Sequence, residues 1–293
     1  MEQLTSIKKN EIQNTKTNLG WGAKSAIWVS ILGYALSQLV VLIPFGIFFV
    51  IGGKEKAQVF IEDNLWATFG LMALSAITML GVVYIFLKRK RLSLNKLGFK
   101  KVIPSDFGYI ILFGILYILV SAGLIVIAGL IPGFNADQKQ DVGFANVQGW
   151  QMLVVFISLV IIPPMAEEIV FRGFLYRGLK NGWQKKPVIL SGIFMAGLVT
   201  LFTGSYWPGL ALLVVMTISV FVSKKSITIA SALFVSSMFG LAHGQWNVAL
   251  DTFVLSIMLI ALYEKTKNLW ACIFLHALKN GVAFVALFVL GGR

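Results

Sequence analysis

Ionisable side chains are rare inside the apolar stretches of this sequence, and the few that occur there could together activate water. An ionisable group at membrane depth is costly unless it is paired or hydrated, so each one is a functional hypothesis by default. The chain contains only two histidines, and both fall inside apolar segments. The full set comprises Glu167, Glu168, Arg172, His243, Asp251, His276 and Lys279, with Asn280 as a neighbouring amide.

Helical spacing predicts which of these side chains meet. Residues four apart share one face of a helix, whereas adjacent residues diverge by about 100°. We therefore expect Glu168 to pair with Arg172, which leaves the Glu167 carboxylate free to face an interior cavity. By the same spacing, the imidazole of His276 and the amide of Asn280 project together from the last helix.

The stretch FGLAHG places a further imidazole on another helix. Phe239 lies four residues before His243 and is expected to stack on the same face, while Gly240 and Gly244 let a neighbouring helix approach closely. A carboxylate, two imidazoles and an amide are what a water-activating site needs. The carboxylate accepts a proton from water, an imidazole ligates a metal or stabilises an oxyanion, and the amide donates to developing negative charge.

Each motif alone has a simpler explanation. A Glu–Arg pair four residues apart is an ordinary helix-surface pair, FGxAHG is a typical helix-packing patch, and one intramembrane histidine can simply bond a neighbour. Lys279 can snorkel, pair with Asp251 or tune the charge of the site, and Asp251 is expected to cap the start of a span. The joint occurrence, which uses both histidines of the chain, favours one shared functional site.

Long apolar runs must position these groups. The 293 residues are 58% hydrophobic and 13% charged, with a mean hydropathy of +0.84, whereas soluble domains carry roughly 25% charged residues. Because a membrane span needs about 20 apolar residues, the sequence predicts an all-α polytopic membrane helix bundle of about 8–9 transmembrane helices. We expect one domain over residues 1–293, with spans at 26–52, 65–87, 107–132, 150–171, 187–203, 206–222, 227–243, 247–263 and 268–290.

The basic residues lie mainly between the apolar runs, where they set membrane topology. The net charge of +13 therefore indicates the lipid bilayer as a partner and no nucleic acid. We expect segments 88–101 and 177–186 inside and segment 133–149 outside. Residues 1–24 lack the apolar core of a signal peptide and are expected to form a flexible cytoplasmic arm. Cys272 is the only cysteine, so no intrachain disulfide is possible.

Three motifs carry a family resemblance. They resemble EExxxR, FxxxH and HxxxN of the CAAX-protease and bacteriocin-processing family of intramembrane proteases, also called the Abi family. The resemblance covers residues 150–290. The matching stretches are EEIVFR (Glu167 to Arg172), FGLAH (Phe239 to His243) and HALKN (His276 to Asn280).

The resemblance implies an α-helical membrane peptidase of the metalloprotease class. It implies that Glu167 activates water, that His243 and His276 bind a metal or steer the water, and that Asn280 polarises the scissile carbonyl. The implied metal ligands are His243, His276 and Glu167, with zinc as the first candidate for one divalent ion. Structural support is expected from Glu168, Arg172 and Phe239.

The family also indicates a substrate and a location. The expected substrate is a membrane-associated or lipidated peptide, and the expected location is a bacterial plasma membrane, which the chain crosses several times. Bacterial relatives are linked to bacteriocin self-immunity and peptide maturation. The oligomeric state is left open.

One departure and two alternatives accompany the resemblance. Residues 173–242, which number 70, separate Arg172 from His243, a longer separation than is usual in the family. The excess predicts a hairpin insertion at 187–222. A proton-coupled transporter would also bury carboxylates and histidines, although repeats in matching halves would then be expected. A non-catalytic immunity or scaffold protein could carry the same motifs.

Overall fold

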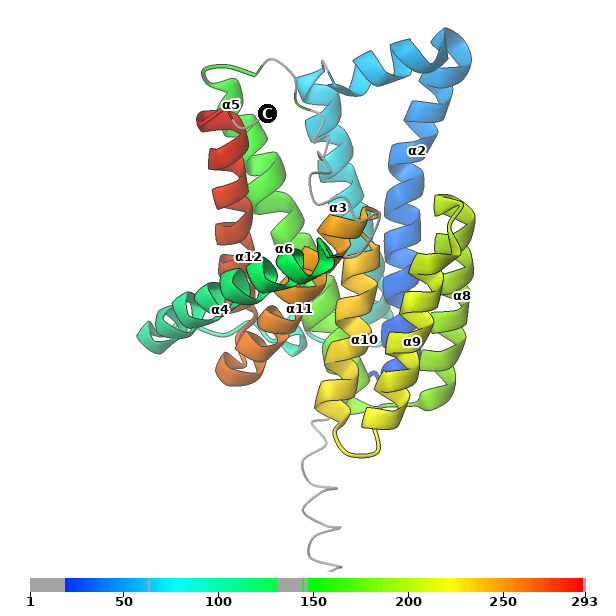
Figure 1. The fold of residues 1–293 in the computed structure, drawn as a ribbon, viewed down its shortest axis with the longest axis vertical. Helices are drawn as coiled ribbons and strands as arrows, with labels where there is room; N and C mark the ends of the chain where they lie inside the picture. Colours follow the sequence, from blue (N-terminus) through cyan, green and yellow to red (C-terminus); the bar gives the residue numbers. More distant parts are fainter. Residues whose placement is uncertain (1–18, 63, 131–143, 145–146, 292–293) are drawn as a thin grey trace, which may run out of the picture.

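The computed structural model describes residues 19–62, 64–130, 144 and 147–291, and the regular elements in this part of the chain are all helical (Figure 1). The predicted all-α class is confirmed. The elements are α2 (Ala23–Glu62), α3 (Leu65–Arg89), η1 (Leu94–Leu97), α4 (Pro104–Ala128), α5 (Gln151–Phe156), η2 (Ile157–Ile161), α6 (Ile162–Glu168), η3 (Ile169–Tyr176), α7 (Arg177–Asn181), α8 (Lys185–Thr203), α9 (Tyr206–Val222), α10 (Ile227–Leu241), α11 (Trp246–Thr266), α12 (Leu269–Phe284) and η4 (Val285–Val289).

Five helical segments within the described residues are long and apolar enough to cross a membrane. Each predicted span falls on a helix, but α9 and α10 are shorter than a full crossing needs. The predicted polytopic bundle is thus supported, whereas its count of eight to nine crossings is not confirmed. The five segments are Ala23–Gly53, Leu65–Arg89, Pro104–Ala128, Gln151–Asn181 and Leu269–Val289.

The helices pack in pairs around the segment that carries the first motif. Helices α2 and α3 run along each other, and α8 and α9 form a hairpin at one edge, next to α2 and α10 (Figure 1). This hairpin occupies the predicted 187–222 region. Helix α4 instead crosses α11 and α12 (Figure 1). Large apolar side chains on the outer faces of α2 and α4 are exposed, among them Leu32, Ile43 and Val126, as lipid contact requires.

The basic connections meet at one end of the bundle. The start of α2 joins the end of α7 through the bond from Ala23 N to Gly182 O, at 3.1 Å. The α3–α4 and α11–α12 connections join through Leu269 N and Gly98 O, at 2.9 Å. Segments predicted to lie on the same side of the membrane are therefore neighbours in space, although their sidedness stays a prediction.

Glu264 ties this basic end together. Its carboxylate accepts from the Tyr176 hydroxyl at 2.9 Å, from Lys267 Nζ at 2.6 Å and from Lys180 Nζ. Burial alone would raise the pKa of Glu264, but the hydrogen bonds from Lys180 and Lys267 outweigh it and lower the pKa below its usual range. The cluster joins α7 to the end of α11.

The last residues of the predicted flexible arm are packed. Residues 1–18 lie outside the described part of the chain, but Leu19 and Trp21 are buried. The Trp21 indole donates to the Phe174 carbonyl at 3.0 Å and stacks on its ring with centroids 5.1 Å apart. The prediction of a flexible arm is therefore wrong for residues 19–22, because an indole with a buried partner anchors the entry to α2.

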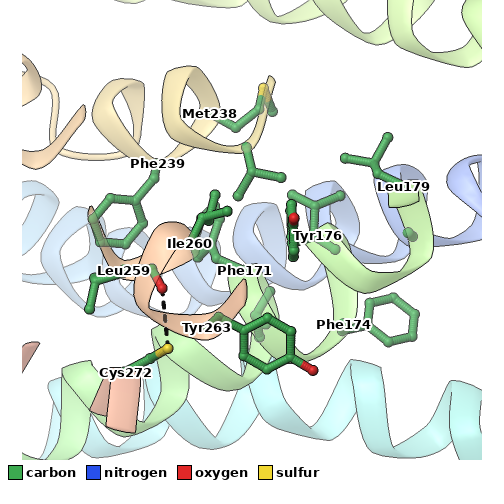
Figure 2. Packing of buried hydrophobic residues seen from close by; sticks show 14 of the residues in the cluster. Phe171, Phe174, Tyr176, Leu179, Met238, Phe239, Leu259, Ile260, Tyr263 and Cys272 are labelled. Atoms are coloured by element: carbon green, nitrogen blue, oxygen red, sulfur yellow. Dashed lines mark hydrogen bonds between the residues drawn. The ribbon is translucent and has the colours of Figure 1, made fainter. Parts of the chain in front are cut away.

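The core lies where η3, α10, α11 and α12 meet. Figure 2 shows Phe171 and Phe239 in this cluster, with the buried Cys272 thiol donating to the Leu259 carbonyl at 3.3 Å. Because lipid is as apolar as these side chains, close packing rather than removal from water holds such helices together. This packed region surrounds the polar residues of the three motifs.

Candidate active site

Two consecutive prolines shape the helix that carries the first motif. Pro163 has no N–H for the carbonyl of Leu159 four residues earlier, and Pro164 has none for a bond five residues back. The chain here forms the π-helix η2, and the Asn280 amide donates to the Leu159 carbonyl at 2.9 Å. Asn280 thus fastens α12 to a carbonyl that the prolines leave without a helical partner.

Glu168, Arg172 and His276 form a buried polar triad. One carboxylate oxygen of Glu168 accepts from Arg172 Nη1 at 2.8 Å and bonds His276 Nδ1 at 2.8 Å. Both charged side chains are 0% exposed. The predicted ion pair is confirmed, whereas its extension to His276 was not predicted. The triad compensates two buried charges and joins the first motif to α12.

The ring of Phe239 brings the two imidazoles together. The Arg172 guanidinium lies over this ring, 4.3 Å from its centroid. The centroid is 5.0 Å from that of His243 and 5.8 Å from that of His276. Phe171 contacts the ring edge-on, with centroids 5.0 Å apart. Both histidines therefore pack against the same aromatic ring.

The tautomer of His276 follows from its partner. A carboxylate can only accept, so the bond to Glu168 requires a proton on Nδ1, and the neutral ring then has its lone pair on Nε2. That Nε2 lies 3.9 Å from the Glu167 carboxylate, whose side chain is 24% exposed. Two acceptors that face each other, here Nε2 and the carboxylate, need a donor between them. A water about 2.8 Å from each acceptor would bridge them with an acceptor–water–acceptor angle of roughly 90°.

His243 lies in the turn between α10 and α11, just beyond the helix in which it was expected. Its Nδ1 is 2.9 Å from the Phe239 carbonyl, which likewise leaves a lone pair on Nε2. The residue before it is held from α2, where the Tyr34 hydroxyl donates to the Ala242 carbonyl at 2.7 Å. Both Tyr34 and His243 interact electrostatically with Glu167. The turn therefore holds its imidazole close enough to Glu167 for the carboxylate charge to act on it.

The two glycines around His243 have different roles. A Cβ on Gly240 would come within 2.7 Å of the Ala249 carbonyl, so this glycine permits the close approach of α11. Gly244 has a φ of +72° and nothing within 4 Å of its Cβ position. The prediction that Gly244 serves helix packing is therefore wrong. This glycine instead lets the chain turn after His243.

The side chains as placed do not form a metal site. Both histidines have the Nδ1-protonated tautomer that suits ligation through Nε2, but no group of three His, Cys, Asp or Glu within the described residues gathers closely enough to hold an ion. At ~2.0–2.1 Å per bond, the separation between Glu167 and His276 would require an angle of about 140° at the metal, far from tetrahedral. The metal ligands implied by the resemblance stay a prediction.

A second polar cluster joins α4, α11 and α12. One oxygen of Asp251 accepts from the Tyr117 hydroxyl at 2.7 Å and the Ser121 hydroxyl at 3.0 Å. The other lies 3.5 Å from Lys279 Nζ. Of the alternatives left open for Lys279, the structure has the interhelical ion pair. The predicted cap role of Asp251 is wrong, because the residue lies in the second turn of α11 and contacts other helices.

Sequence reasoning missed the residues that hold the motifs in place. Tyr34 and Leu159 belong to no motif, and their partners lie 208 and 121 residues away. The double proline was a usable signal, since it predicts free carbonyls close to the carboxylates. A tyrosine hydroxyl inside an apolar span was another, because such a group seeks a partner.

Comparison with protein families gives one match. The model for Rce1-like proteins, described as type II CAAX prenyl endopeptidases, matches residues 149–233 and 219–282. No curated protein and no solved structure matches the chain. The matched residues include all three motifs and the candidate site. Residues 149–282 of this multi-pass membrane protein, 134 of its 293 residues, are therefore similar to the Rce1-like proteins, in agreement with the resemblance of the motifs.

Proposed function

We propose that this protein is an intramembrane endopeptidase that cleaves a membrane-associated or lipidated peptide with water activated by Glu167. The observation that carries the proposal is the separation of 3.9 Å between the Glu167 carboxylate and His276 Nε2. Glu168, which is paired with Arg172, bonds the Nδ1 side of His276 and so orients the ring. The Nε2 lone pair of His276 and the Glu167 carboxylate therefore face a gap that one water could fill.

The chain's own residues can perform the hydrolysis. Glu167 takes a proton from the water as its oxygen bonds to the scissile carbonyl carbon, and His276 Nε2 accepts the other hydrogen bond and orients the water. The same proton then passes from Glu167 to the leaving nitrogen as the C–N bond breaks. The products are a carboxylic acid and an amine, which ionise to a carboxylate and an ammonium group.

Asn280 and His243 are proposed to act on either side of this water. One N–H of the Asn280 amide is bonded to the Leu159 carbonyl, and the second N–H could donate to the oxyanion. His243, with its lone pair on Nε2, can accept from the water or the substrate amide. A divalent ion, zinc in the first instance, would act as a Lewis acid if it bound here. The test is whether removal of metal with 1,10-phenanthroline abolishes cleavage.

The proposal is tested by comparative peptidomics of membranes that contain either wild-type protein or Glu167→Gln. The isosteric amide cannot take the proton, so the peptides released by the wild type should be absent with the variant at equal protein abundance. Lys265→Gln is the matched control, since this exposed lysine is remote from the site. An unchanged peptide profile would support the non-catalytic scaffold instead. We further propose that the protein resides in a bacterial plasma membrane and acts in bacteriocin self-immunity or peptide maturation.

A further inference from the structure

Lys279 and Asp251 form a loose ion pair beside the candidate active site. Lys279 lies three residues after His276, so the two side chains leave α12 on neighbouring faces. Lys279 also interacts electrostatically with His243. A cation thus stands within reach of the groups that are proposed to hydrolyse the peptide bond.

The aspartate does not depend on the lysine. The Tyr117 and Ser121 hydroxyls already donate to one oxygen of Asp251, at 2.7 and 3.0 Å. The ammonium of Lys279 lies 3.5 Å from the other oxygen, which is longer than an ordinary hydrogen bond of about 2.7–3.2 Å. Asp251 is therefore fixed from α4, while the ammonium keeps donors for another acceptor.

The pair is also open. The side chain of Lys279 is 24% exposed and that of Asp251 is 22% exposed. Charged groups in a transmembrane bundle do not face lipid but border a hydrated or substrate-lined space. The exposure of Glu167, at 24% of its side chain, meets the same requirement. Lys279 also lies on α12 between His276 and Asn280, two residues of the candidate site.

We propose that Lys279 binds a carboxylate of the peptide substrate, and that Asp251 is its counter-ion when no substrate is bound. This inference rests on the proposed peptidase function and names a recognition element for it. A peptide brings a carboxylate at its C-terminus or on an acidic side chain, and lysine binds such an anion as a point charge. Asp251 cannot follow the lysine because α4 holds it, so a substrate carboxylate replaces it at the ammonium.

The test measures binding separately from cleavage. Full-length Glu167→Gln in detergent is titrated with a fluorescent farnesylated tetrapeptide, Cys-Val-Ile-Met, as the free acid and as the C-terminal amide. The acid should bind at least about tenfold more tightly, since a hydrogen bond to a charged group contributes more than ~1.4 kcal/mol. An amidated peptide with an added aspartate distinguishes a side-chain carboxylate from the terminal one.

Two further substitutions should shift the binding of the acid in opposite directions. Lys279→Gln should remove the preference for the acid, and Asp251→Asn, which keeps an acceptor for Tyr117 and Ser121, should tighten acid binding. Lys265→Gln should leave the preference intact. Equal binding of acid and amide, no binding of the acid, or a loss of affinity for both peptides with both variants would overturn the proposal, the last result indicating a structural pair.

A second measurement distinguishes failure of this inference from failure of the proposed function. Wild-type protein is assayed in parallel for cleavage of the same peptides. Cleavage without a preference for the acid would refute the carboxylate site and leave the peptidase intact. A preference for the acid that Lys279→Gln removes, without cleavage of either peptide, would support the binding site and count against the peptidase.

Discussion

Substitution of Glu168 tests whether the two adjacent glutamates have different roles. Glu168 is 0% exposed and pairs with Arg172, which is also 0% exposed, whereas the Glu167 side chain is 24% exposed and faces His276 at 3.9 Å. We expect Glu168→Gln to destabilise the protein and Glu167→Gln to leave its stability unchanged while removing activity.

The magnitude follows from the burial of the pair. Removal of one partner of a buried ion pair costs ~3–5 kcal/mol, because the other charge stays buried without compensation. Arg172 Nε and Nη2 already lack hydrogen-bond partners among the described residues. No nearby acceptor among these residues is therefore available to replace the carboxylate of Glu168. Glutamine keeps one oxygen acceptor, which places Glu168→Gln at about 3 kcal/mol. At 2–4 °C per kcal/mol, we expect a fall in Tm of roughly 6–12 °C.

The assay is thermal unfolding of the purified full-length chain in mild detergent, followed by tryptophan fluorescence. Glu167→Gln is the matched control and should melt within about 3 °C of wild type, since an amide at a partly exposed position adds less than ~1 kcal/mol. The double variant Glu168→Leu/Arg172→Met should recover part of the stability, because an apolar pair of similar volume leaves no charge uncompensated. A wild-type Tm for Glu168→Gln would refute the reasoning.

Three other predictions concern the residues that hold the site and the chain's topology. Asn280→Ala should lower the free energy of unfolding by ~1–3 kcal/mol, because the Leu159 carbonyl loses its hydrogen-bond donor. Denaturant titration measures this change. An unchanged free energy of unfolding would leave the proposed oxyanion contact as the remaining role of Asn280. Tyr34→Phe, which removes only the hydroxyl bonded to Ala242, should lower kcat for a cleaved peptide with KM unchanged, and an equal kcat would show that the bond does not position His243. In a Cys272→Ser background, Gln140→Cys should react with an impermeant thiol reagent from outside while Asn95→Cys is protected, and the reverse pattern would invert the topology.

Local spacing rules predicted the contacts between residues four apart in the chain. The Glu168–Arg172 pair and the Phe239–His243 contact both span four residues, and both are present. The all-α class follows equally from composition. Such features depend on local chain geometry, which is the same wherever the segment is placed in the bundle.

Contacts between distant segments could not be predicted from the sequence. His276 bonds Glu168 across 108 residues, and Tyr34 reaches Ala242 across 208. In a membrane many packings bury the same apolar faces equally well, so the apolar pattern does not select one of them. The crossing of α4 over α11 and α12 and the loose pair of Lys279 with Asp251 depend on that choice. Polar bonds between helices, which few pairings can satisfy, help to select it.

The bond from Tyr34 has a consequence for how the chain can be divided. Tyr34 belongs to α2, whereas the family match begins at residue 149. The matched region is therefore smaller than the structural unit that holds the candidate site, because a helix outside the match supports the turn bearing His243. A shortened protein made of the matched residues would lack this brace. A hybrid that takes its first helices from another protein would keep this support only if the replacement helix also places a hydroxyl group beside the Ala242 carbonyl. The N-terminal helices are therefore part of the framework that positions the candidate site.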